Sequence, residues 1–129
     1  MDETTKDEIR SILNEIFQNN SQVLMISLAD ETGLPILTFN RESNNIISEI
    51  TDSGITNRYA ALAGASATLG DRTLSTLSQE RVRLIHVQGK ERDIAIAVSQ
   101  NLICLVVTVP SGSPNLVAEK LNTQLKAKI

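Results

Sequence analysis

The residues that could support chemistry are few and scattered along the chain. Cys104 and His86 are the only cysteine and the only histidine, so they are the one possible pairing of a thiol nucleophile with an imidazole base. They fall in different predicted strands, which we expect to lie two positions apart in one sheet. Cys104 is therefore interpreted as a small hydrophobic residue of a central strand, and His86 as an edge or interface residue. The sequence predicts no catalytic residues and no enzymatic activity.

Metal and phosphate sites have no better support in the sequence. One histidine and one cysteine fall short of a structural zinc set. The carboxylates of Glu42, Glu49 and Asp52 do not have the spacing of a calcium loop and are interpreted as solvated loop charges. The segment from Gly64 to Gly70 lacks the Gly-Lys-Ser/Thr ending of a phosphate-binding loop, and helix packing explains its glycines better. We therefore expect no metal and no cofactor.

The composition favours a small globular protein and argues against several kinds of partner. The 129 residues are 41% hydrophobic and 21% charged, which fits a single domain spanning residues 1–129. A net charge of −3 and an aromatic content of 2% argue against nucleic-acid binding. No segment approaches the roughly 20 apolar residues of a membrane span, and the acidic start MDETTKDE lacks the pattern of a signal peptide. With a single cysteine, the expected location is the reducing cytoplasm.

The hydrophobic pattern predicts three helices and five strands. Thr5 and Glu8 form a capping-box pattern that begins a helix ending near 19–20. Ser113 and Pro114 predict the start of the last helix, which should turn Leu116 inward. Residues 40–54 are interpreted as a connection. The other residues expected to face inward in the last helix are Val117, Leu121 and Leu125. The remaining elements are a central helix at 55–78 and strands at 23–29, 34–39, 81–88, 93–99 and 102–109.

The predicted fold class is α/β, with a five-stranded antiparallel sheet in the order 2-1-5-4-3. The strands at 23–29 and 102–109 are apolar almost throughout, so they should lie in the middle of the sheet. Pro35 cannot donate a ladder hydrogen bond, which favours an edge position for the second strand. The N- and C-terminal helices should cover one face and the central helix the other. The strand at 81–88 is then left as an open edge.

The central helix lacks the charged outer face of an ordinary surface helix. On a helical wheel, one stripe contains its larger apolar residues together with a serine and a threonine, and we expect it to face the sheet: Ile55, Tyr59, Leu62, Ser66, Leu69, Thr73 and Leu77. The opposite side is small and should contact a second helix from another copy of the chain. The predicted dimer or partner interface consists of Asn57, Arg58, Ala60, Ala61, Gly64, Ala65, Thr68 and Arg72, with Arg83, Ile85 and Val87 from the open strand. Arg58 and Arg72 could act as arginine fingers, but ordinary surface charges are the favoured interpretation.

The order and spacing of these elements resemble the roadblock/dynein light chain family from about Ile9 to Leu125. The hairpin turn Asp30–Ile36 (DETGLPI) is close to the family's acidic-Gly-Leu-Pro-Ile turn. The central helix rich in alanine, glycine and serine, Gly89 between two strands, and the apolar last strand add to the resemblance. The complete N-terminal helix and the lysines near the C-terminus, Lys126 and Lys128, depart from the shortest members.

The resemblance implies a single α/β domain of the roadblock type that dimerises through its second helix and third strand and has no catalytic residues. Family members serve as scaffolds or regulators, often of small Ras-like GTPases. The expected function is therefore a non-catalytic homodimeric scaffold that binds such a GTPase and modulates its nucleotide cycle or localisation, with other roadblock or longin-type chains as further partners. The alternative is a monomeric small-ligand sensor of the profilin or PAS-like type, which would hold its ligand between helix and sheet.

Overall fold

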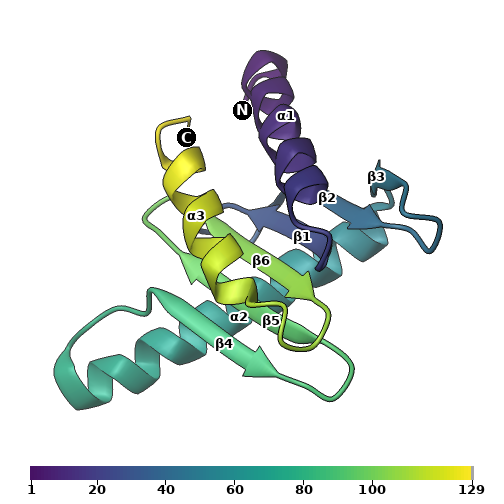
Figure 1. Ribbon diagram of the computed structural model, residues 1–129. Coiled ribbons are helices and arrows are strands. Elements are labelled where there is room, and N and C mark those ends of the chain that lie inside the picture. The colour runs from purple at the N-terminus through teal and green to yellow at the C-terminus, as the bar shows by residue number, and fades with distance from the viewer. Residues whose placement is uncertain (129) are drawn as a thin grey trace.

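A computed structural model describes residues 1–128 as helices packed on both faces of one antiparallel sheet (Figure 1). The sheet has six strands in the order β3-β2-β1-β6-β5-β4, and every neighbouring pair is antiparallel. The elements in chain order are α1 (Glu3–Asn19), β1 (Val23–Ala29), β2 (Pro35–Arg41), β3 (Ile47–Glu49), α2 (Ser53–Ser78), β4 (Leu84–Gln88), β5 (Asp93–Val98), β6 (Ile103–Thr108) and α3 (Pro114–Lys126).

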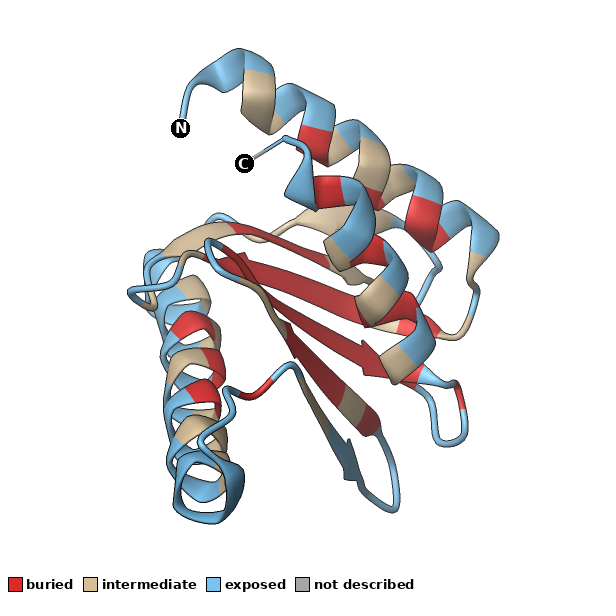
Figure 2. Ribbon diagram, turned by 90° about the vertical axis from the view of Figure 1, so that its left-hand side faces the viewer, coloured by how far each residue is buried: buried red, intermediate tan, exposed pale blue. Residues whose placement is uncertain are grey.

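The two faces of the sheet have separate hydrophobic cores (Figure 2). On one face, α1 and α3 bury residues such as Phe17 and Leu121 against β1, β2 and β6. On the other face, α2 contributes only alanines to the buried core, together with strand residues such as Leu105. The sheet is therefore covered by large side chains on one face and by a close-packed helix on the other.

The central strands β1 and β6 owe their position to their sequence. All six residues of β6 are buried, and so are six of the seven in β1. Strands with apolar residues on both faces must be covered on both faces, as these are. Inside the sheet, the hydroxyls of Ser27 and Thr38 lie opposite one another and share a hydrogen bond of 3.0 Å, which satisfies both buried groups.

The sheet differs from the prediction by one additional strand. The five predicted strands occur in the predicted order, but β3 lies outside β2, in the segment interpreted as a connection. Its three residues are too few to show an alternating pattern, so the sequence carried little signal for it. The edge position predicted for the second strand from Pro35 is therefore wrong for the strand as a whole. It holds locally, because β3 pairs only with Phe39–Arg41 and leaves Pro35 without a neighbour on that side.

The ends of the terminal helices also differ in detail from the prediction. Helix α1 begins at Glu3, two residues before the expected cap, and the Asp2 carboxylate accepts the Thr5 N–H at 2.7 Å. Helix α3 begins at Pro114 as expected, but Ser113 is left-handed and its side chain makes no capping bond. Leu116, predicted to face inward, is 64% exposed. It lies outside the buried face of α3, which is formed by Pro114, Val117, Ala118, Leu121 and Leu125.

Candidate interaction surface

Four of the larger apolar residues of α2 are exposed, although the prediction turned them toward the sheet, whereas Tyr59 of the same predicted stripe is half-buried against the core as expected. Ala60, Ala63 and Ala67 are the buried residues of the helix. The exposed fractions of the predicted inward residues Leu62 and Leu69 are instead 56% and 67%. Ile55 and Leu77, from the same predicted stripe, are also exposed, at 37% and 78%. We call these four residues, Ile55, Leu62, Leu69 and Leu77, the apolar stripe.

Close approach explains why α2 turns three alanines, Ala60, Ala63 and Ala67, toward the rest of the chain, while other small residues such as Ala61 and Ala65 stay exposed. A Cβ atom built on Gly64 would lie 3.5 Å from the Cα of Gly33, in the β1–β2 turn. A Cβ on Gly70 would lie 2.9 Å from Val82, which is closer than side chains normally approach. Alanine and glycine let the helix lie this near to the sheet, whereas leucines on the same side would hold it away. The small residues therefore serve packing within the chain.

The polar side chains of α2 are largely used within the helix itself. The Asp52 carboxylate caps its first turn by accepting the Gly54 N–H at 2.9 Å. Hydroxyls farther along donate to the carbonyl four residues earlier, as Thr68 does to Gly64 at 3.0 Å and Thr73 does to Leu69 at 2.9 Å. These hydroxyls are turned toward the backbone, so their hydrogen bonds are made within the helix.

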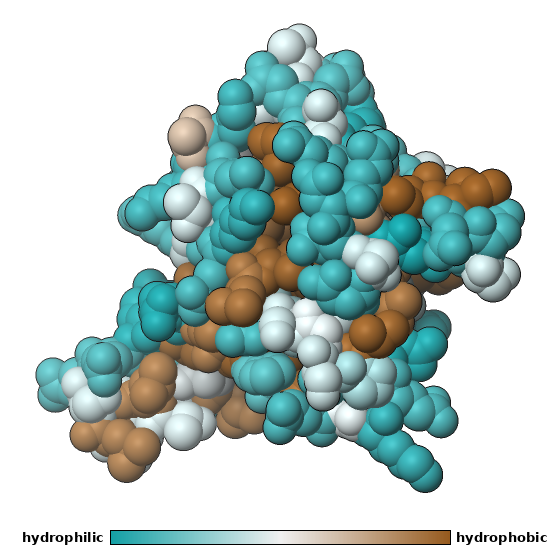
Figure 3. All heavy atoms as spheres, in the orientation of Figure 1, coloured by the Kyte–Doolittle hydropathy of each residue, from teal (hydrophilic) through white to brown (hydrophobic). Residues whose placement is uncertain are grey.

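Strand β4 provides a second exposed feature near the apolar stripe. It pairs with β5 on one side only and ends the sheet on the other. Ile85 packs against the core on the α2 side, and Val87, two residues later on the same face, is 49% exposed. The C-terminal part of α2 extends past β4 (Figure 1), and hydrophobic atoms gather at that end of the helix (Figure 3).

Most of the predicted interface residues are accessible, and so are apolar neighbours that the prediction turned toward the sheet. Asn57, Arg58, Ala61, Ala65, Thr68, Arg72, Arg83 and Val87 are exposed, and Gly64 and Ile85 are half-buried. Ala60 is only 1% exposed and lies against the sheet, so a partner cannot contact it in this structure. These neighbours are the residues of the apolar stripe. The seven-residue spacing of Ile55, Leu62 and Leu69 was a usable signal, because it is typical of a helix-pairing seam.

The residues that might have done chemistry are separated and occupied structurally. Cys104 is fully buried in β6, and this burial raises the pKa of its thiol to about 12. Its sulfur lies 4.0 Å from Asn122 Oδ1. His86 is exposed on β4, two strands away, as the predicted order implied. Within residues 1–128, no three metal-ligating side chains cluster and no buried side-chain polar atom lacks a hydrogen-bond partner.

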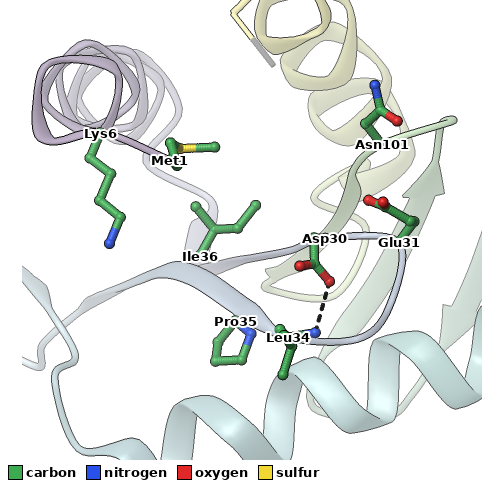
Figure 4. Close-up of a pocket in the computed structure, with 8 residues that line it drawn as sticks. All are labelled: Met1, Lys6, Asp30, Glu31, Leu34, Pro35, Ile36 and Asn101. Atoms are coloured by element: carbon green, nitrogen blue, oxygen red, sulfur yellow. Dashed lines mark hydrogen bonds between the residues drawn. The ribbon is translucent and has the colours of Figure 1, made fainter.

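One hollow lies between α1 and the β1–β2 turn (Figure 4), with a volume of about 470 Å³. Lys6 lines it from the helix and Asp30 from the turn. The Asp30 carboxylate is used by the turn itself, since it accepts the Thr32 hydroxyl at 2.6 Å and the Leu34 N–H at 3.0 Å. Hydrogen bonds from Thr32, followed by those from the loop backbone, hold the pKa of Asp30 below its usual range. This acidic residue is a turn-forming group.

A second hollow, of about 440 Å³, lies between α2 and the sheet, where the alternative sensor function would place a ligand. Gly64 and Asp71 line it from the helix, and Ser99 lines it from the β5–β6 turn. Asp71 is already occupied, because it accepts the Val82 N–H at 2.7 Å and the Arg81 guanidinium at 3.3 Å. The hollow therefore offers a ligand no free buried charge.

Solved structures of other proteins share the overall arrangement of these helices and strands. MglB described as a gliding protein of Thermus thermophilus matches with a TM-score of 0.75 and 13% identity, covering 99% of this chain and 93% of that one. A structure titled "MglB with tetrameric arrangement" matches with a TM-score of 0.76 and 13% identity, covering 99% and 92%. The chain has the roadblock fold.

A roadblock/LC7 domain from Streptomyces avermitilis extends this likeness, with a TM-score of 0.65 and 14% identity over 88% of each chain. No family model and no curated protein matches the sequence. The roadblock likeness thus lies in the fold, at low sequence identity. Among the residues that the structure describes, no helix has the length and apolar character needed to cross a membrane.

Proposed function

We propose that this protein is a non-catalytic, homodimeric regulator or scaffold of a small Ras-like GTPase. The observation that carries the proposal is the exposed apolar stripe of α2, whose C-terminal end reaches the unpaired edge of β4. Exposed leucines at regular helical spacing favour contact with another helix, and a free strand edge favours contact with another strand. A second copy of the chain offers both at once.

The GTPase partner is supported by the roadblock fold and by the absence of a competing site in the described residues. MglB and roadblock/LC7 structures share the architecture. The thiol of Cys104 is buried, and the carboxylates of Asp30 and Asp71 are already used in hydrogen bonds within the chain. Any effect on a bound GTPase would then come from the shape and charge of the surface, with Arg58 and Arg72 on its exposed part.

Two measurements on the purified chain test this proposal. Light scattering should give a mass of about 28 kDa, twice the 14.1 kDa of one chain. Calorimetric titration with a panel of Ras-like GTPases, loaded with GDP or with a non-hydrolysable GTP analogue, should show binding to one nucleotide state of at least one of them. A persistent monomer at tens of micromolar would contradict the homodimer. Failure of the whole panel in both nucleotide states would contradict the GTPase partner.

A further inference from the structure

The hydrogen bonds between β4 and β5 determine which backbone groups of β4 are free. The Val98 N–H donates to the Arg83 carbonyl at 2.8 Å, and the Gly89 N–H donates to the Arg92 carbonyl at 2.9 Å. In an antiparallel pair, residues alternate between those that bond to the neighbouring strand and those that do not. Because Arg83 and Gly89 both bond to β5, the odd-numbered positions from 83 to 89 direct their backbone N–H and C=O groups toward β5.

The even-numbered residues of β4 therefore direct their N–H and C=O groups to the open edge. These residues are Leu84, His86 and Gln88. Two copies related by a twofold axis can pair only through these outward groups. One register uses all three: His86 then lies opposite the partner's His86, and Leu84 lies opposite the partner's Gln88. A shift of two residues in either direction leaves one of the three without a partner, which is costly for a backbone group in an interface.

We propose that two copies join along β4 in this register, so that the two His86 side chains meet at the twofold axis and make the dimer sensitive to protons. The inference rests on the proposed homodimer and adds its register and its regulation. Directly opposed residues of a hydrogen-bonded antiparallel pair have Cα atoms about 5.5 Å apart, and their side chains project from the same face of the sheet.

The position of α2 is consistent with this arrangement. A twofold axis perpendicular to the sheet places both α2 helices on one face, side by side and antiparallel. The C-terminal part of α2, which extends past β4, would then lie over the partner's β4 (Figure 1). Leu69 and Leu77 would pack against the partner's Val87, which gives an apolar contact to side chains that are 67%, 78% and 49% exposed in one chain.

The charges around His86 leave the two imidazoles uncompensated when both are protonated. His86 projects from the same face as Leu84, which packs against the α1 and α3 core. On that face, Glu119 of α3 is 3.5 Å from Arg83. Asp93, on β5 opposite Gln88, is buried and accepts the Ser111 N–H at 3.0 Å. No ion pair among the described residues includes His86, so like charges at the axis repel one another.

Single cysteines placed along the edge test the register. Opposed Cα atoms about 5.5 Å apart are within the span of a disulfide. Under mild oxidation, His86→Cys should cross-link to a species of twice the mass, whereas Leu84→Cys and Gln88→Cys should do so only when mixed with each other. Cys104 is fully buried, so the native chain is the control that should not cross-link. Efficient cross-linking of Leu84→Cys or Gln88→Cys alone would overturn the register.

The proton sensitivity is tested by measuring the dimer dissociation constant at pH 8 and pH 5.5. Histidine is the side chain whose charge changes in this interval. Repulsion at this separation should weaken the native dimer about three- to tenfold at the lower pH. His86→Gln, which keeps a polar side chain without the charge, should change less than twofold. Equal weakening of both proteins would overturn the role of His86.

These outcomes are distinguishable from failure of the proposed function. A native chain that is monomeric at pH 8 contradicts the homodimer itself. A native dimer of about 28 kDa whose His86→Cys variant stays dimeric when reduced but does not cross-link when oxidised contradicts only the register. Light scattering of each reduced variant therefore accompanies the cross-linking.

Discussion

At the scale of single residues, the glycines of α2 decide how near the helix lies to the rest of the chain. Gly70 is the most constrained, since a Cβ there would lie 2.9 Å from Val82, a residue only 7% exposed. Asp71 reinforces the contact by accepting the Val82 N–H at 2.7 Å. This turn of the helix is thus joined to the segment that leads into β4, and helps to fix the distance between α2 and the open edge.

Gly70→Ala should lower the free energy of unfolding by about 1 kcal/mol. Overpacking against Val82 costs about 2 kcal/mol, and the better helix propensity of alanine offsets about 1 kcal/mol of it. In a Val82→Ala background the strain is removed, so the same substitution should raise the free energy of unfolding by about 1 kcal/mol. Urea denaturation of the four proteins measures the coupling, and equal effects in both backgrounds would refute the close contact.

At the scale of elements, the two sides of α2 have different roles. The buried side of alanines serves the fold, and the apolar stripe is exposed although it contains the larger side chains. Leu62 and Ala61 are neighbours in sequence, are both exposed, and lie on different sides of the helix, with Leu62 in the stripe and Ala61 on the small side. They therefore form a matched pair for deciding which side a second copy contacts.

Leu62→Glu should dissociate the dimer, and Ala61→Glu should leave it intact. A twofold interface contains each substitution twice, and burying two uncompensated carboxylates there should raise the dissociation constant at least about a hundredfold. Light scattering measures the mass, and circular dichroism checks that α2 remains helical. If Ala61→Glu dissociates the dimer and Leu62→Glu does not, the small side is the interface after all.

The elements could largely be predicted from the sequence because their patterns are local. The apolar runs of β1 and β6 and the periodicity of α1 determine what each segment forms, and short turns determine which strands are neighbours. The orientation of α2 could not be predicted in the same way. A wheel ranks residues by hydrophobicity, but the buried side of α2 consists of alanines, and a close contact fixes Gly70, where a Cβ would lie 2.9 Å from Val82. The separation of Cys104 from His86 could be predicted, because it depends only on the order of the strands.

At the scale of the whole molecule, one chain leaves part of its apolar surface exposed. On the face covered by α1 and α3, residues such as Phe17 and Leu121 are fully buried. On the other face, Leu69 and Val87 remain exposed beside an unpaired strand. If a second copy covers these groups, part of the folding free energy belongs to the dimer, and the stability of the chain must depend on its concentration.

The melting temperature of the native protein should therefore rise by about 2–3 °C for each tenfold increase in concentration. A tenfold increase stabilises a dimer by about 1.4 kcal/mol, or about 0.7 kcal/mol per chain, and a domain of this size has an unfolding entropy of about 0.27 kcal/mol/K. Leu69 belongs to the apolar stripe, so the Leu69→Glu variant should melt at a lower temperature that does not vary with protein concentration. Scanning calorimetry over two decades of concentration measures both. A native melting temperature that is independent of concentration would mean that one chain folds without its partner, and that the exposed stripe is reserved for a different protein.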